Sequence, residues 1–315
     1  MPPTMRNAAA RVCPTRVTRC DRGLRESQSR KVSKSQRKTS GAAPLCDSAT
    51  LRLSYNPPVQ SITRTEVVRI TGAGRDIGAD EVVVEEPLEI RVGEKPVSVT
   101  LRTPGEDFDL AAGFLFTESI VKDGDIESIR HWGSPNVVRV DVRGAVDLQR
   151  LQRHFYSTSS CGVCGKVSID ALRVQTTPLA SAARVAPDVL VTLPEALRGQ
   201  QKTFDATGGI HAAGIFDTDG NLLRIREDIG RHNAVDKVLG SYVRERTPLD
   251  RHILVVSGRT SFEIVQKAIV ARVPILAAVG APSSLAIELA REFNLTLLGF
   301  VRDGRCNVYA GADRV

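Results

Sequence analysis

The feature that most constrains the fold of this chain is a regular alternation, from residue 210 onward, of short apolar segments with amphipathic segments of about ten residues. The pattern predicts strands at 210–216, 222–226, 253–256, 275–279 and 295–301, and helices at 231–242, 262–272 and 284–293. The first two strands form a hairpin around Asp219-Gly220-Asn221. Strands separated by helices of this length favour a layered α/β domain with a parallel or mixed sheet, which we assign to residues 201–315.

The preceding part of the chain is richer in strands and predicts a smaller N-terminal domain at 61–145. Strands are expected at 81–85, 88–92, 97–102 and 137–142, with Pro87 breaking the first two apart. An apolar stripe predicts one helix at 107–117. Residues 146–200 are assigned to a short helix (147–156), a polar loop and a linker rich in Pro and Ala. The fold class is therefore α/β in the second half and α+β over the whole chain.

Residues 1–60 form a basic extension whose composition predicts disorder. They hold twelve of the 43 Lys and Arg but only three of the 36 Asp and Glu, so the rest of the chain carries about −2 of the net +7. The charge therefore gives no argument for nucleic-acid binding. The extension looks superficially like a transit peptide, but a dispensable extension or a start codon assigned too early is the favoured interpretation. No run in the chain approaches the ~18 apolar residues of a membrane span. The scattered cysteines form no disulfide framework and point to a reducing cytoplasm.

The loop Ser160-Cys161-Gly162-Val163-Cys164-Gly165-Lys166 holds the chain's one CxxC pair. A zinc site would need four ligands, and the sequence offers no second CxxC, no HxxxH pair and no H-x-E. Dithiol redox exchange suits the spacing, but the pair lies mid-chain and not at a first βα turn. Sulfur carriage needs an accessible thiolate, which the flanking glycines and Lys166 favour, and a second thiol can assist release. The residues favour sulfur carriage over redox exchange, and zinc is supported least.

Glycines and small hydroxyl residues collect where predicted strands end and helices begin. Residues 257–261 (SGRTS) and 280–284 (GAPSS) follow strands, and 207–211 (TGGIH) leads into one. Helix starts at one edge of a sheet offer unpaired N–H groups to an anion. Ordinary helix capping explains each loop taken singly. Their repetition favours a ligand that bears phosphate, although no Walker A or GxGxxG motif is present.

Two charged clusters allow both a structural and a functional interpretation. Residues 226–237 place Arg, His, Asn and Asp between a strand and a helix. A solvated charge run is the plain interpretation, and His232 is a candidate for proton transfer or capping. Residues 300–305 (FVRDGR) end the last strand with two arginines, which alone indicates a charged turn. Cys306 beside it is typical of a core cysteine.

Five motifs together resemble one known family. They are CGVCG, TGGIHAAGIFD, REDIGRHNAVDKVLG, VSGRTSFEIVQKA and VPILAAVGAPSSLAIELA, in this order. The chain from about residue 65 to its C-terminus resembles the formate dehydrogenase accessory sulfurtransferases (FdhD). The resemblance implies a cytoplasmic homodimer whose C-terminal domain is similar in fold to cytidine deaminase but lacks its zinc. Because of the charge balance and the lack of a long apolar run, we expect no nucleic-acid or membrane partner.

The activity that the resemblance implies is sulfur transfer. Such a sulfurtransferase receives sulfur from a cysteine desulfurase and passes it to molybdenum (or tungsten) bis-molybdopterin guanine dinucleotide. The sulfurated cofactor then enters formate dehydrogenase, whose activity depends on this step.

The resemblance also implies roles for single residues. Cys161 matches the cysteine that carries the persulfide, and Cys164 matches its assisting partner. The cofactor-binding stretch matches Phe300, Val301, Arg302, Asp303, Gly304 and Arg305, so the arginine turn becomes a candidate ligand of the guanine dinucleotide. The alternative is a non-catalytic chaperone that binds the cofactor and uses CxxC for docking or redox exchange.

Overall fold

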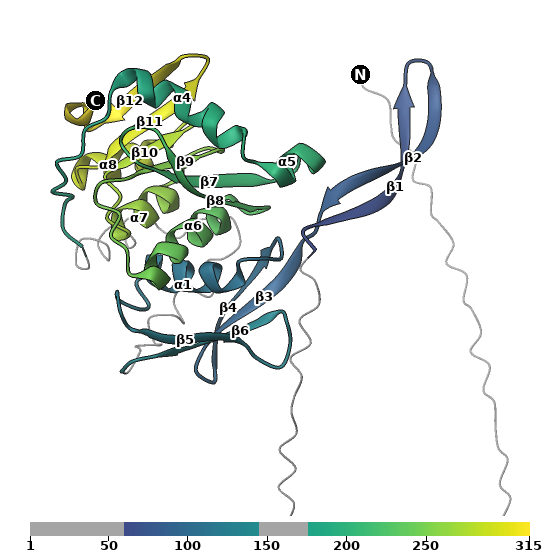
Figure 1. The fold of residues 1–315 in the computed structure, drawn as a ribbon, viewed down its shortest axis with the longest axis horizontal. Coiled ribbons are helices and arrows are strands. Elements are labelled where there is room, and N and C mark those ends of the chain that lie inside the picture. Colours follow the sequence, from purple (N-terminus) through teal and green to yellow (C-terminus); the bar gives the residue numbers. More distant parts are fainter. Residues whose placement is uncertain (1–59, 145–175) are drawn as a thin grey trace, which may run out of the picture. The chain divides into compact units, whose positions relative to one another are not determined.

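The computed structural model describes residues 60–144 and 176–315, which form three sheets (Figure 1). The largest has six strands in the order β12-β11-β10-β9-β7-β8. These are β7 (His211–Phe216), β8 (Leu222–Asp228), β9 (Ile253–Val256), β10 (Ile275–Ala278), β11 (Thr296–Arg302) and β12 (Arg305–Ala310). β9, β10 and β11 are parallel, and the other neighbours pair antiparallel. β9 and β10 are apolar throughout and buried, as expected of strands covered on both faces.

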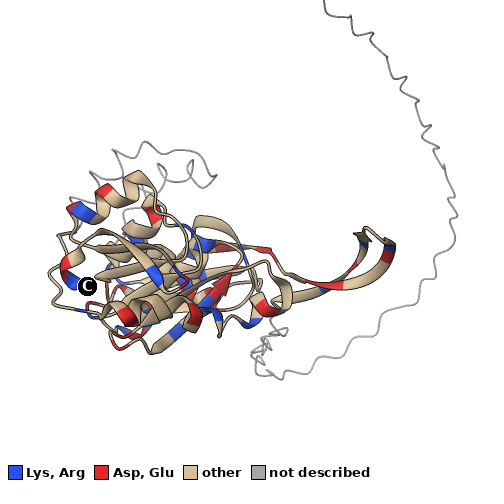
Figure 2. Cartoon of the chain, turned by 90° about the horizontal axis from the view of Figure 1, so that it is seen from above, with Lys and Arg blue, Asp and Glu red and all other residues tan. Residues whose placement is uncertain are grey.

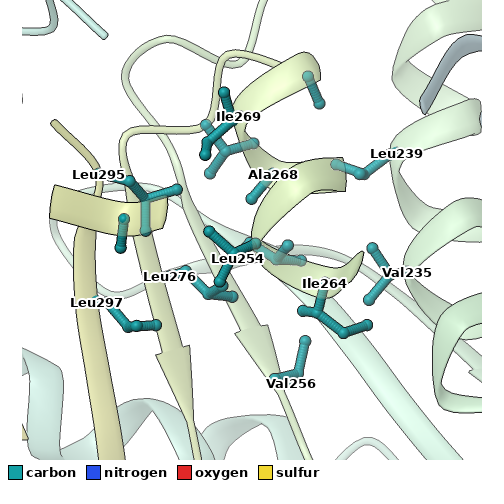
Figure 3. Packing of buried hydrophobic residues seen from close by; sticks show 14 of the residues in the cluster. Val235, Leu239, Leu254, Val256, Ile264, Ala268, Ile269, Leu276, Leu295 and Leu297 are labelled. Atoms are coloured by element: carbon teal, nitrogen blue, oxygen red, sulfur yellow. The ribbon is translucent and has the colours of Figure 1, made fainter. Parts of the chain in front are cut away.

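Helices cover both faces of the six-stranded sheet. One face carries α6 (Arg231–Glu245), α7 (Phe262–Val270) and α8 (Ser284–Glu292), and the other carries α4 (Pro187–Arg198). Figure 3 shows Leu254 of β9 and Leu276 of β10 beside Ile264 of α7 in the first interface. On the opposite face, Leu190 and Leu193 of α4 are fully buried against the sheet. This part of the chain is therefore a three-layer α/β/α arrangement.

A four-stranded sheet and helix α1 make up most of the N-terminal part. The sheet has the order β4-β3-β6-β5. Its strands are β3 (Glu86–Val92), β4 (Lys95–Arg102), β5 (Ile126–His131) and β6 (Val137–Val142), and α1 spans Asp107–Thr117. Alternation along β3 buries Leu88 and Ile90 on the face that packs against Leu110 and Leu115 of α1.

Two glycines allow α1 to pack directly on α6. A Cβ on Gly113 would lie 1.9 Å from the carbonyl oxygen of Asp236, and a Cβ on Gly240 would lie 1.9 Å from that of Asp109. The two helix backbones therefore touch at this crossing, and any side chain at either glycine would push them apart. Because α6 also packs on the six-stranded sheet, the crossing joins α1 to the C-terminal layers.

The third sheet is a hairpin of β1 (Ile62–Thr71) and β2 (Gly74–Val83). The strands pair antiparallel without interruption from Ile62–Val83 to Thr71–Gly74. Apolar side chains on it stay exposed, including Ile70 at 81% and Ile77 at 67%. Short helix α5 (Lys202–Thr207) lies against β2.

The mixed α and β architecture is confirmed, and so are the strands and helices predicted after residue 210, with small shifts at their ends. The prediction of a strand at 81–85 is wrong in extent, because β2 runs from Gly74 to Val83. Pro87 does not break a strand but lies within β3. There it pairs with Leu101 and precedes the stretch bonded to β6, so its missing N–H disrupts no bond on that side.

Some elements were not predicted, and some predictions are not decided by these residues. No strand or helix was predicted at the positions of β1, β5, β12, α4 and α5. The helix expected at 147–156 lies outside the described residues. The domain boundaries at 61–145, 146–200 and 201–315 and the likeness to cytidine deaminase stay predictions.

Charged residues of both signs are spread over the described elements (Figure 2). This fits the nearly balanced charge of the sequence beyond residue 60. No helix within residues 60–144 and 176–315 is long and apolar enough to cross a bilayer. In the same part of the chain, no group of three His, Cys, Asp or Glu is arranged to hold a metal ion.

Candidate functional site

The loops singled out by the sequence meet at one edge of the six-stranded sheet. Parallel β9, β10 and β11 all end there, which brings together residues 257–261, 280–284 and 300–305. We call these three loops the carboxyl-end rim. Because β7 runs antiparallel to β9, it begins at this edge with His211, and β8 ends beside it at Asp228. The predicted common edge is thus present.

Backbone hydrogen bonds link the three loops of the rim into a row. The amide of Gly280 donates to the carbonyl of Gly258 at 3.1 Å, and the amide of Phe300 donates to the carbonyl of Gly280 at 3.1 Å. A Cβ on Gly280 would lie 2.9 Å from the Gly258 oxygen, so the close approach requires glycine there. Thr260 and Pro282 add an isolated parallel bridge between the first two loops.

The two serines that precede α7 and α8 behave differently. The hydroxyl of Ser283 accepts a hydrogen bond from the amide of Ala286 at 3.2 Å, which is ordinary N-capping. Ser261 caps no backbone amide of α7. Its hydroxyl lies 3.2 Å from Nε2 of His232 instead. Capping therefore explains Ser283 but not Ser261.

The turn at 300–305 presents most of its side chains outward. Phe300 and Asp303 both have a φ of 53°, and the pairing of β11 with β12 is irregular between Gly299 and Arg302. The Arg302 guanidinium lies 5.7 Å from the centre of the Phe300 ring. Val301 differs, because its side chain is fully buried in the core. The remaining residues Asp303, Gly304 and Arg305 are exposed.

Much of the charged cluster at 226–237 is structural. Asp228 and Lys237 are fully buried and form an ion pair at 2.9 Å. The Asp228 carboxylate also accepts from the amides of Thr103 at 3.1 Å and Gly230 at 2.8 Å, and from the side chain of Asn233 at 3.0 Å. A buried pair with this many hydrogen bonds fixes the start of α6 against the loop before α1. The plain interpretation as a solvated charge run is wrong for these residues.

His232 faces the rim. Burial and then the charges of Lys267 and Arg231 lower the pKa of His232 to about 4. The ring is therefore neutral near pH 7, with Nε2 directed at Ser261 and 4.0 Å from a carboxylate oxygen of Glu263. A pKa this low does not suit the proton transfer near neutral pH that the sequence suggested for His232.

Cys161 and Cys164 lie outside the described residues, so their predicted roles stay predictions. Cys306 lies on β12, where its partly buried side chain packs against the core and burial raises the pKa of its thiol. This agrees with the interpretation of Cys306 as a core cysteine.

Sequence reasoning missed Arg231 as a candidate. The residue is the first of α6, and its charge lowers the pKa of both His211 and His232. The signal was present in the REDIGRHN motif, but the sequence does not distinguish a buried pair such as Asp228–Lys237 from a charge left facing the rim.

Comparison with known proteins places this geometry in a family. The FdhD/NarQ family profile matches residues 83–315. The sulfur carrier protein FdhD of Streptomyces coelicolor is 48% identical over 267 residues, covering 80% of this chain and 95% of the relative. That of Mycolicibacterium paratuberculosis is 49% identical over 272 residues, covering 82% and 100%. That of Sulfolobus acidocaldarius is 41% identical over 256 residues, covering 81% and 98%.

A solved crystal structure supports the fold. It is of a protein from Desulfotalea psychrophila assigned as a formate dehydrogenase accessory protein. It aligns with a TM-score of 0.68 at 23% identity, covering 81% of this chain and all of that chain. With the profile match over most of the chain and relatives near half identity, the chain belongs to the FdhD/NarQ family.

Proposed function

We propose that this protein is a sulfur carrier that matures formate dehydrogenase. The observation that carries the proposal is membership of a family whose similar relatives are named sulfur carrier proteins, in a chain with one CxxC pair. The persulfide is carried on Cys161, and a cysteine desulfurase supplies the sulfur. The protein acts as a cytoplasmic homodimer and depends on that donor for each turnover.

The sulfur enters by exchange between thiol groups. The Cys161 thiolate attacks the terminal sulfur of a persulfide on the donor, the donor cysteine leaves as a thiolate, and Cys161 becomes a persulfide. No net oxidation occurs in this step. For release, the Cys164 thiolate attacks the inner sulfur of that persulfide, a Cys161–Cys164 disulfide forms, and the terminal sulfur leaves as hydrosulfide. The two cysteines together supply the two electrons that convert sulfane sulfur into sulfide, and a dithiol reductant must reduce their disulfide before the next turnover.

The acceptor is the metal of bis-molybdopterin guanine dinucleotide, bound as a substrate at 300–305. Exposed Arg302 and Arg305 suit bidentate binding of phosphate, and the Phe300 ring suits stacking on a guanine base. Asp303 and Gly304 shape the turn between the arginines, whereas Val301 contributes only backbone because its side chain lies in the core. The sulfurated cofactor is then passed to formate dehydrogenase.

Mass spectrometry tests the carrier role. After incubation with a cysteine desulfurase and cysteine, the peptide containing Cys161 is expected to gain the mass of one sulfur atom, and a reductant should remove it. The peptide containing Cys306 serves as the internal control and should gain nothing, since burial raises the pKa of that thiol. If Cys161 gains no sulfur while the protein still binds the cofactor, the chain is a cofactor-binding chaperone and the carrier proposal fails.

Substitution of both turn arginines tests the acceptor site. Arg302→Gln with Arg305→Gln should weaken cofactor binding at least about tenfold, because each removes a charged hydrogen-bond donor to phosphate. Calorimetry with the isolated cofactor measures the affinity. Arg251 is an exposed arginine just before β9, and Arg251→Gln, which removes one positive charge away from the rim, should have little effect. Unchanged affinity in the double variant would rule out the turn as the binding site.

A further inference from the structure

The guanidinium of Arg231 carries an unsatisfied donor beside the rim. Its Nε is buried and has no hydrogen-bond partner among the described residues. A buried donor left unpaired in this way is unfavourable unless a ligand or water satisfies it. Nearby Glu263 is exposed to solvent over 58% of its side chain and lies on α7, where it is within 4.0 Å of His232.

Two neutral histidines flank Arg231. Burial and then the charge of Arg231 lower the pKa of His211, with Asp228 opposing the shift. His232 is neutral for similar reasons, with Lys267 and Arg231 lowering its pKa and Glu263 and Glu118 opposing. Both rings are therefore positioned next to positive charge. A bound anion would raise the pKa of both histidines, because its negative charge stabilises the protonated rings.

Gly258 of the rim lies beside both His211 and Arg231. A Cβ on Gly258 would lie 3.5 Å from Nδ1 of His211 and 3.9 Å from Cδ of Arg231, so these three residues adjoin. Thr260 of the same loop is 1% exposed, and its hydroxyl has no hydrogen-bond partner among residues that the structure describes. Two donors without a hydrogen-bond partner, Nε of Arg231 and the hydroxyl of Thr260, therefore belong to or adjoin the loop that follows β9.

This region lies two strands from the arginine turn. Gly258, Gly280 and Phe300 follow one another along the rim, joined by the two backbone hydrogen bonds described above. Neighbouring strands are about 4.8 Å apart, so the Arg231 region and Phe300 are separated by about 10 Å along the edge. One ligand of nucleotide size can reach both places.

We propose that Arg231, His211 and the loop 257–261 form a phosphate subsite for the ligand whose other end is held at 300–305. The subsite takes a phosphate or diphosphate group of a nucleotide, with the guanidinium as the charged donor and the histidine rings as further donors. It rests on the proposed function for the identity of the whole ligand. It does not depend on that function for the binding of the anion itself.

The experiment measures binding of inorganic diphosphate to the full chain by calorimetry. Arg231→Gln should weaken binding at least about tenfold, because a charged donor to phosphate is lost. Arg251→Gln, with the same charge change at the opposite end of β9, should stay within about twofold. Glu263→Gln should tighten binding, since it removes a carboxylate beside the subsite. Thermal unfolding of each variant confirms that it remains folded.

A second measurement uses sulfate, whose charge stays constant over the pH range of interest. Because anion binding favours protonation of His211, the affinity for sulfate should rise as the pH falls from 8 toward 5.5, with uptake of protons, whereas His232 with a pKa of about 4 contributes little in this range. The rise should be smaller in His211→Gln. An affinity independent of pH would show that the histidines take no part.

The proposal is overturned if wild-type protein binds no diphosphate, or if Arg231→Gln and Arg251→Gln weaken binding equally. Failure of the proposed function has a different signature. In that case Cys161 takes up no sulfur from the desulfurase, while diphosphate binding still depends on Arg231. Conversely, a protein that loads Cys161 normally but binds diphosphate without regard to Arg231 would retain the function and lose this subsite.

Discussion

Replacement of Cys161 with alanine should abolish the formate dehydrogenase activity that depends on this protein. Alanine has no sulfur to accept or pass on, so no part of the group transfer survives. The activity is measured as formate-dependent dye reduction in cells that produce only the variant. Binding of the cofactor and of diphosphate by the purified variant should be unchanged, because the rim is built from residues 257–261, 280–284 and 300–305.

Cys306→Ala is the matched control for this experiment. It removes a thiol from the same chain, but one that lies on β12 with a raised pKa and packs against the core. Formate dehydrogenase activity should remain near the wild-type level. An active Cys161→Ala strain would remove the persulfide role from that residue, and equal losses in both variants would point to a general effect on folding.

Gly240→Ala should have the largest effect on stability. The new methyl group would lie 1.9 Å from the Asp109 carbonyl oxygen and 2.4 Å from the Gly113 amide nitrogen. Because these are backbone atoms of α1, relief requires the two helices to separate. The expected loss is about 3 kcal/mol or more in the free energy of unfolding, measured by denaturant titration.

Gly199→Ala is the control for the helix crossing. Gly199 ends α4 with a φ of −63°, and its Cβ would lie 3.5 Å from the Glu195 carbonyl oxygen, an ordinary contact. The free energy of unfolding should change by less than about 1 kcal/mol, and a small gain is expected from the reduced freedom of the unfolded chain. A similar loss in both variants would contradict the close packing of α1 on α6.

The elements that could be predicted are those whose burial leaves a recognisable pattern of apolar residues in the sequence. β9 and β10 are buried on all sides and read as short apolar runs, and α7 carries an apolar stripe. The β1–β2 hairpin leaves residues such as Ile70 exposed, so no core-facing alternation reveals it. Helix α4 begins at Pro187 and contains Pro194, and these prolines indicated a linker instead.

The sequence predicted which loops belong to the candidate site, but it did not predict which charged side chains there are buried and paired. Helix starts after neighbouring parallel strands lie at one edge of a sheet, which predicted that 257–261 and 280–284 lie together, whereas 300–305 was linked to them only through the family resemblance. Sequence alone does not reveal that Asp228 and Lys237 neutralise each other in the interior, whereas Nε of Arg231 has no hydrogen-bond partner in the described chain. That division depends on burial, which comes from contacts between elements distant in sequence.

The hydrogen-bonded row of Gly258, Gly280 and Phe300 bears on how ligand preference can be transferred between relatives. The three segments are distant in sequence, but backbone hydrogen bonds hold each one in position against the next one along the rim. A chimera that exchanges one segment alone for a segment of different backbone conformation would lose these bonds to the neighbours. Grafting a new specificity onto this scaffold therefore calls for replacing all three segments from the same donor.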